Sequence, residues 1–336
     1  MRTMNIKEFA KKLNLSVSTV SKAFRQGYDI NPQTRERILA AAKEFNYQPN
    51  PAATSLRTQK NKTIAVILPA IDNSFFVLVI KGIEAVAQEN GYHVLIYLTH
   101  EDYQKEVSLT QNIQKGRVDG VLMSLSDGSK DFAHLDELNQ KGVPVVFFDR
   151  IYENENYFQV TTNDRESSFL ATQHLIDQGC KKIAHFYLEK NLSISNNRML
   201  GYKEALEKNK LKISNQLIKG FENDSELAYK TILQLLKKEK PDGIFSSFEK
   251  LAMLCYKACD ELGLNIPSDV KITSFSNLEI ASLLNPSLTT ITQPAFQIGE
   301  AAAKTLIDLI DQNIKPSSDK KIILPSVLIK RKSTAN

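Results

Sequence analysis

The stretch IKEFAKKLNLSVSTVSKAF, residues 6–24, decides the fold of the first part of the chain. Its first apolar residues follow the i, i+3, i+4, i+7 spacing of one buried helix face: Ile6, Phe9, Ala10 and Leu13. Asn5 is placed to cap this helix, and after a break at 14–16 Ser16 can cap a second helix that buries Val20 and Phe24. Two helices joined by so short a turn are typical of a helix-turn-helix.

A third helix completes this part. Asn31 can cap it with Pro32 at its first position, a place that proline favours. Its apolar residues are expected to close a three-helix core: Ile38, Leu39, Ala42 and Phe45. Such a bundle need not bind DNA, so a purely structural role stays open on spacing alone.

Charge separates the two parts of the chain. Residues 1–60 hold 11 Lys and Arg against 4 Asp and Glu, a net +7, whereas residues 61–336 have a net −2. A basic module gains sequence-independent affinity for DNA by releasing counterions. The positive balance therefore favours a nucleic-acid partner for the first part only.

Several segments resemble the lactose/galactose repressor (LacI/GalR) family of transcriptional regulators. The resemblance rests on these segments in order: IKEFAKKL (6–13), SVSTVSK (16–22), TRERILAAA (34–42), YQPN (47–50) and SLR (55–57). It implies a helix-turn-helix DNA-binding domain over residues 1–48 and a hinge over residues 49–61.

The same resemblance implies which side chains contact operator DNA. Val17 and Ser18 would approach base edges, and Lys22 stands where the family usually carries an arginine to guanine. Thr19 and Ser21 suit phosphate contacts, although an ordinary solvated position is the alternative for each. The full expected set is Ser16, Val17, Ser18, Thr19, Ser21, Lys22, Ala53, Leu56 and Arg57.

Within the hinge, Ala53 and Leu56 are three apart and would share one face of a single helical turn. So short a helix is not stable alone in water. The resemblance implies that it folds only when two copies of the chain meet on the operator, with Leu56 as an apolar wedge in the minor groove. A homodimer is therefore expected.

The remaining 275 or so residues alternate strand and helix signals, beginning with the apolar run TIAVIL at 63–68. We expect two doubly wound α/β lobes of like topology. The segments PDGIF (241–245), ELGL (261–264), IPSDV (266–270) and LTTITQP (288–294) are similar to the effector core of the same family, a periplasmic-binding-protein type 1 fold.

That fold implies three crossings between the lobes, placed near Thr161, Thr292 and Lys321. The core over 62–336 would then divide into lobe 1, about 62–160 and 292–321, and lobe 2, about 161–291 and 322–336. Small ligands bind between such lobes, at the C-terminal ends of strands.

The effector contacts are expected from motif position: Asp72, Phe75, Phe76, Asp149, Arg150, Arg198, Phe248 and Ser276. A salt-bridged lobe rim is the alternative for Asp149 and Arg150, and a core position is the alternative for Phe76. Ser276 stands where the family commonly has a carboxylate, and Phe248 stands where it often has an amide. We therefore expect a more apolar and less acidic cleft, which weakens the case for a plain hexose and adds weight to a phosphorylated or acidic sugar.

Enzyme chemistry finds no support in the sequence. Nucleotide-binding, zinc-protease and serine-hydrolase motifs are absent. The five histidines are scattered, and each is expected to be a surface or half-buried residue rather than a metal ligand. Cys255 and Cys259 fit buried free thiols in a reducing cytosol. No signal peptide or long apolar run supports the alternative of a secreted sugar-binding protein. A DNA-tethered enzyme and a general nucleoid protein remain alternatives.

The sequence thus predicts a cytoplasmic, homodimeric DNA-binding regulator, of repressor type, with no cofactor, no metal and no membrane contact. Its operator affinity would be switched by a small, carbohydrate-derived effector.

Overall fold

A computed structural model describes residues 4–24, 30–47, 61–113, 116–128, 131–188, 192–222, 224–313 and 319–335. The chain divides into two compact units, Met1–Lys62 and Thr63–Asn336, which are considered separately.

Unit 1 contains three helices, α1 (Ile6–Lys12), α2 (Val17–Ala23) and α3 (Pro32–Glu44). All three expected caps are confirmed. The Asn5 side chain accepts from the amides of Lys7 and Glu8 in a capping box, and the Ser16 hydroxyl accepts from the Thr19 amide. Asn31 caps α3, with Pro32 at its start.

The core of unit 1 is centred on Phe9, whose ring stacks on Tyr47 with centroids 4.2 Å apart. The expectation that Leu39 closes this core is wrong, because its side chain is 36% exposed. Leu39 follows the buried Ile38, and each step along a helix turns by about 100° away from the buried face. Phe24 and Phe45 are only half-buried.

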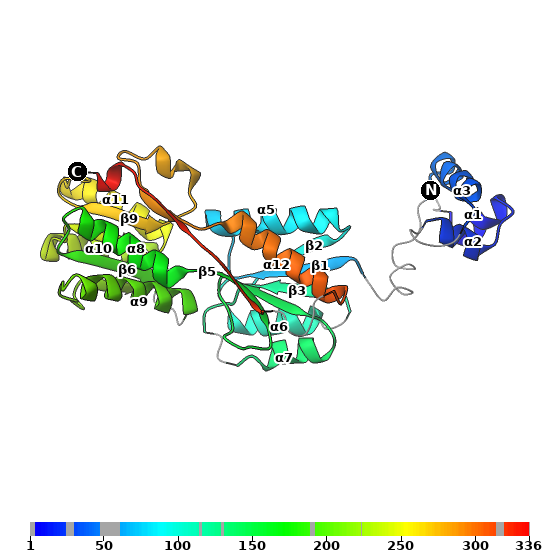
Figure 1. The fold of residues 1–336 in the computed structure, drawn as a ribbon, viewed down its shortest axis with the longest axis horizontal. Coiled ribbons are helices and arrows are strands. Elements are labelled where there is room, and N and C mark those ends of the chain that lie inside the picture. Colours follow the sequence, from blue (N-terminus) through cyan, green and yellow to red (C-terminus); the bar gives the residue numbers. More distant parts are fainter. Residues whose placement is uncertain are drawn as a thin grey trace. The chain divides into compact units, whose positions relative to one another are not determined.

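Unit 2 consists of two α/β lobes, each built on a six-stranded sheet (Figure 1). The lobe 1 sheet is formed by β1 (Thr63–Leu68), β2 (His93–Leu98), β3 (Gly120–Met123), β4 (Val145–Phe148), β5 (Phe158–Thr162) and β11 (Lys321–Leu324). The lobe 2 sheet is formed by β6 (Ile183–Leu188), β7 (Ile218–Phe221), β8 (Gly243–Ser246), β9 (Lys271–Phe275), β10 (Thr289–Thr292) and β12 (Val327–Ile329).

The two sheets have equivalent strand orders, β2-β1-β3-β4-β5-β11 and β7-β6-β8-β9-β10-β12. Every pair is parallel except β10 with β12. The expected two lobes of like topology are therefore confirmed.

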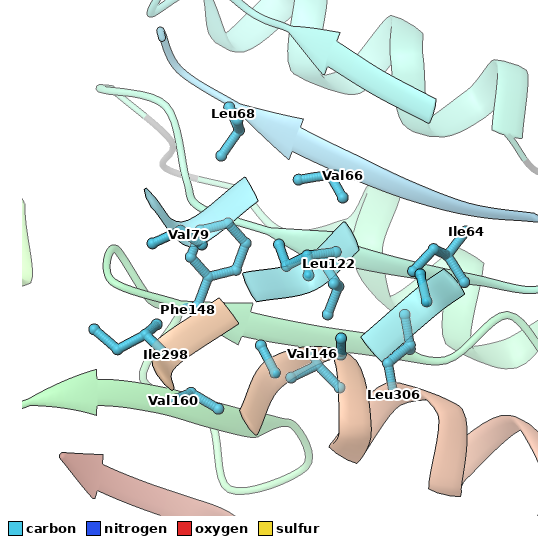
Figure 2. Close-up of a cluster of buried hydrophobic side chains, with 14 of the residues drawn as sticks. Ile64, Val66, Leu68, Val79, Leu122, Val146, Phe148, Val160, Ile298 and Leu306 are labelled. Atoms are coloured by element: carbon cyan, nitrogen blue, oxygen red, sulfur yellow. The ribbon is translucent and has the colours of Figure 1, made fainter. Parts of the chain in front are cut away.

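In lobe 1, alternate residues of β1 face opposite sides of the sheet. Ile64, Val66 and Leu68 pack under α5 (Ser74–Glu89) and α12 (Ala295–Ile310), as Figure 2 shows. The other face is covered by α6 (Tyr103–Ile113) and α7 (Ala133–Gln140) (Figure 1).

Lobe 2 has the same layered arrangement. One face of its sheet packs against α10 (Ser225–Glu239) and α11 (Glu249–Leu262). The other packs against α8 (Asp164–Asp177) and α9 (Ser193–Lys208). Two short 3-10 turns, η1 (Glu279–Ser282) and η2 (Lys332–Thr334), complete the lobe.

The chain passes between the lobes three times: after β5, after β10 and after β11. Figure 1 shows the last passage as the red segment that leads from β11 to β12. The sequence placed this passage near Lys321, whereas Lys321–Leu324 still pairs with β5 in the lobe 1 sheet. The third crossing therefore lies at 325–326.

Candidate functional site

The outward side of α2 carries the residues expected to read DNA. Val17 is 40% exposed, and Ser18 and Lys22 are exposed. Thr19 and Ser21 are half-buried, and the hydroxyls of Ser16 and Thr19 lie 2.8 Å apart. Ser16 and Thr19 are thus already engaged in capping α2, which fixes the start of the helix.

Two arginines of α3 hold the helix-turn-helix together. Arg35 Nε donates to the Ala23 carbonyl at 3.1 Å, and an Arg37 amino group donates to the Leu13 carbonyl at 3.1 Å. Both carbonyls end helices, where cations are favourable. Sequence reasoning did not find this role. The hinge residues Ala53, Leu56 and Arg57 lie outside the described residues.

A cavity of about 420 Å³, including the part open to solvent, lies between the two lobes of unit 2. It is lined by Asn73, Phe75, Phe76, Asp149, Arg150, Ile194, Arg198, Ser247, Phe248, Glu249, Phe275, Ser276, Asn277 and Gln293.

Seven of the eight residues expected to contact an effector line this cavity; Asp72 does not. Asp72 is exposed and borders a separate surface hollow next to η1. Phe76 lines the cavity and also belongs to the lobe 1 core, where it is 1% exposed. The alternative of a core position for Phe76 is therefore also met.

Arg198, on α9, is buried at one side of the cavity. Its Nε donates to Asp164 Oδ1 at 2.6 Å, and one amino group donates to the Ser247 carbonyl at 2.6 Å. Its guanidinium lies over the Phe275 ring, 3.8 Å from the centroid. These contacts use part of the arginine fork and leave its charge balanced by a buried carboxylate.

Arg150 and Asp149 follow β4 on the lobe 1 side. One amino group of Arg150 donates to both carboxylate oxygens of Glu101 at 2.9 Å. Burial raises the pKa of Asp149 to about 6, against the opposing effect of Arg150 and Arg198. Asp149 also has φ of 60°, a left-handed backbone that favours Asn, Asp and Gly. Arg150 Nε also lies 4.0 Å from Asp149 Oδ2. The alternative of a salt-bridged rim therefore holds for both residues, with Glu101 as the nearer partner of Arg150.

Glu249 is the residue that sequence reasoning missed, and it corrects the expectation of a less acidic cleft. One oxygen of its carboxylate accepts from the Ser74 amide at 3.0 Å. The other accepts from the Ser276 hydroxyl at 3.0 Å and the Asn277 amide at 3.1 Å. Because Ser74 begins α5 of lobe 1 and Glu249 begins α11 of lobe 2, this carboxylate spans the cleft.

Asn277 and Gln293 were also missed. The side-chain amide of Asn277 donates to the backbone carbonyl of Gln293 at 2.7 Å. The side-chain amide of Gln293 donates to Thr162 Oγ1 at 3.1 Å. Thr162 Oγ1 in turn donates to Asp164 at 3.0 Å. Both missed residues follow strand ends, as the predicted ones do, and this position was the available signal.

Two buried polar atoms of the cavity wall have no hydrogen-bond partner among the described residues, Arg150 Nε and Asn277 Oδ1. One is a donor on lobe 1 and the other is an acceptor on lobe 2. Buried polar atoms are normally paired, so these two mark positions that a ligand or water can satisfy.

The histidines differ from expectation. His134, His174 and His185 are buried, whereas His93 and His100 are exposed. Their neighbours explain the burial: His134 pairs with Glu106 at 3.1 Å and His174 bonds to Thr334. His185 stacks on aromatic rings, and burial lowers its pKa to about 3.

The three cysteines are buried free thiols. Within the described ranges, no group of three or more His, Cys, Asp or Glu side chains could hold a metal ion. Across the same ranges, none of the helices has the length and apolar character that crossing a membrane requires.

Comparisons with known proteins agree with this architecture. Residues 5–50 match the family described as bacterial regulatory proteins, lacI family, and residues 172–334 match the periplasmic binding protein-like domain. The chain is 32% identical to the ribose operon repressor of Halalkalibacterium halodurans, over 98% of this chain and 96% of that protein.

Solved structures show the same fold. The lac repressor dimer bound to operator and the anti-inducer ONPF aligns with TM-score 0.86 at 21% identity, over 100% of both chains. A LacI family transcriptional regulator from Enterococcus faecium with bound ribose aligns with TM-score 0.71 at 27% identity, over 81% of this chain and 98% of that one. Because the family match covers the helix-turn-helix and the ribose operon repressor of H. halodurans is similar along nearly its whole length, the chain belongs to the lacI family of bacterial regulatory proteins.

Proposed function

We propose that the chain is an operator-binding repressor whose affinity for DNA is switched by a small carbohydrate-derived ligand held between the lobes of unit 2. The observation that carries this proposal is the cavity lined by polar and aromatic side chains of both lobes, on the same chain as a capped helix-turn-helix. A ligand held by both lobes stabilises one lobe arrangement over others. The relation to a ribose operon repressor supports the same conclusion.

The cavity wall suits a ligand rich in hydroxyl groups. A hydroxyl both donates and accepts, so it can satisfy Asn277 Oδ1 on one lobe and Arg150 Nε on the other. Phe75 and Phe248 provide apolar surface for the C–H face of a sugar ring. Ribose in the E. faecium regulator shows that a relative binds this class of compound.

On the DNA side, we propose that Val17, Ser18 and Lys22 contact base edges. We propose that Thr19 and Ser21 contact phosphates, and that Ser16 contacts DNA at the start of the same helix. Of the hinge residues expected from sequence, we propose that Leu56 inserts into the minor groove as an apolar wedge and that Ala53 and Arg57 contact DNA beside it. The protein would act as a homodimer on a near-palindromic site. It would be cytoplasmic and have no enzymatic activity. We also propose the domain boundaries expected from the sequence, with the third crossing between the lobes moved to 325–326.

The full-length chain tests this proposal. DNA would be selected from a random pool, and a panel of sugars, sugar phosphates and nucleobases would be screened by thermal unfolding. A ligand at 100 times its Kd stabilises the native chain by about 2.7 kcal/mol. The expected result is a palindromic consensus whose binding the ligand alters. Equal affinity for all sequences would support a nucleoid protein instead, and turnover of the ligand would support a DNA-tethered enzyme.

A further inference from the structure

The start of α5 lies at the mouth of the cavity, and its amides already have acceptors. The Asn73 side chain accepts from the Phe76 amide at 2.9 Å, and Glu249 accepts from the Ser74 amide at 3.0 Å. The first amides of a helix are a favourable place for an anion. In this chain a carboxylate from the opposite lobe takes that place.

The same carboxylate is fixed by its own lobe. Ser276 and Asn277 both donate to its second oxygen, so Glu249 has a bonded partner on each side of the cleft. Glu249 also stands in the first turn of α11, where a negative charge is favourable. The hydrogen bonds from Ser74 of lobe 1 and from Ser276 and Asn277 of lobe 2 together fix the position of this carboxylate between the lobes.

No cation of the cavity wall lacks an acid partner among the described residues. Arg150 is bonded to Glu101, and Arg198 is bonded to Asp164. Asp149 adds another carboxyl group to the wall. A phosphate or carboxylate entering the cavity would therefore meet the carboxyl groups of Glu249 and Asp149, while the charge of each arginine is already balanced by a carboxylate.

We infer that Glu249 is a specificity-determining residue that excludes anionic ligands, because it joins the two lobes at the position where an anionic group would otherwise bind. The ligand class that remains is neutral and hydroxylated. This inference rests on the proposed ligand site and opposes the sequence-based expectation of a phosphorylated or acidic sugar.

The first test measures amide hydrogen exchange in the full-length chain without ligand or DNA. In Glu249→Ala, the peptide that contains Ser74 should exchange about tenfold faster or more, the factor expected from losing one charge-assisted hydrogen bond. Glu226→Ala, at an exposed position on α10, is the control. Faster exchange at Asn277 alone, with Ser74 unchanged, would show that Glu249 acts within lobe 2 only and would overturn the inference.

The second test compares ribose with ribose 5-phosphate, and glucose with glucose 6-phosphate, by thermal unfolding. The two sugar phosphates should leave the thermal-unfolding midpoint of the wild-type chain unchanged and should raise the midpoint of Glu249→Gln. The control variant Glu226→Gln should behave as the wild-type chain does. Wild-type stabilisation by either phosphate, or no gain in Glu249→Gln, would overturn the inference. The exchange test uses neither ligand nor DNA, so a negative result there would refute the role of Glu249 and leave the proposed repressor function intact. If no operator sequence is selected from the random pool, the repressor function is refuted and the exchange result still stands.

Discussion

Arg198 combines two roles at the residue scale, since it lines the cavity and neutralises a buried acid. Its partner Asp164 is 5% exposed and also accepts from Thr162. Removing one member of such a pair leaves an uncompensated buried charge. Any functional test of Arg198 by truncation therefore also changes the stability of lobe 2.

Arg198→Ala should lower the free energy of unfolding by about 3–5 kcal/mol, because Asp164 loses its buried partner. The double variant Arg198→Met with Asp164→Asn should recover much of that loss. Arg165→Ala is the matched control, since Arg165 pairs with Glu204 at the surface, where ion pairs contribute little. Urea unfolding measures all three; equal effects of the Arg198 and Arg165 variants would contradict the buried pair.

Asp149 should make stability depend on pH in a defined direction. Its pKa rises from 3.8 to about 6 on burial, so the folded chain keeps a proton that the unfolded chain releases. The stability that this proton confers is present below about pH 4 and declines as pH rises through 6. Asn tolerates the same left-handed backbone and cannot ionise.

The stability of Asp149→Asn relative to the wild-type chain should therefore increase as pH rises from 4 to 7, by an amount on the order of 2 kcal/mol. Unfolding in urea at several pH values measures this difference. Asp72→Asn, at an exposed position in the same lobe, is the control. A difference between Asp149→Asn and wild type that stays constant across the range would refute the raised pKa.

Lys22→Ala should relax the preference at one symmetric base pair per half-site, at a cost of about 1–3 kcal/mol in specific binding. Lys22 is exposed near the end of α2, so the substitution leaves the core of unit 1 intact. Binding to a library of single-base operator variants measures the preference, with Lys43→Ala as the control. An unchanged profile with a smaller salt slope would make Lys22 a phosphate contact.

At the scale of elements, α5 and α12 approach through two glycines. A Cβ at Gly82 would lie 2.1 Å from the Phe296 carbonyl oxygen, and one at Gly299 would lie 2.1 Å from the Val79 carbonyl oxygen. Only glycine allows the two backbones to approach this closely. The contact fixes the layer that covers β1 in lobe 1.

Gly82→Ala should therefore destabilise the chain by about 1–3 kcal/mol through overpacking. The sign is diagnostic, because alanine in place of glycine inside a helix ordinarily stabilises by about 1 kcal/mol. Lys81→Ala, an exposed neighbour, controls for helix propensity. A stabilised Gly82→Ala variant would show that α5 and α12 are not in backbone contact.

The elements with a strong local signal were predictable from the sequence. Capped helices such as α1 and α3 and apolar strands such as β1 follow from spacing and composition. Strand β5, with the sequence FQVTT, and β7, with IKGF, were not expected, because neither contains a continuous apolar run. Pairing with neighbouring strands makes them strands.

The same distinction applies to the cavity. Arg198 and Asp149 could be placed from motif position, and both line it. The role of Glu249 depends on a contact with Ser74, 175 positions away in the chain. No local pattern reports such a contact, so the acidity of the cleft could not be read from Ser276 and Phe248 alone.

At the scale of unit 2, hydrogen bonds connect the cavity between the lobes to all three crossings. Gln293, after β10, bonds to Thr162 at the end of β5, and Asn163 accepts from the Ser326 amide at 2.9 Å. Thr162 also contacts Asp164, the partner of Arg198. A ligand that contacts Arg198 can therefore bias the arrangement of the crossings, and with it the lobe angle.

The most direct test of the central claim is to titrate the ligand found in the screen into the full-length chain with and without selected operator DNA. Linkage requires that the factor by which ligand changes operator affinity reappears in the effect of operator on ligand affinity, typically about 5–150-fold. We predict two distinct ligand affinities related by that factor. Ligand affinities that agree within error, for a ligand bound in the cavity, would contradict a ligand-switched repressor.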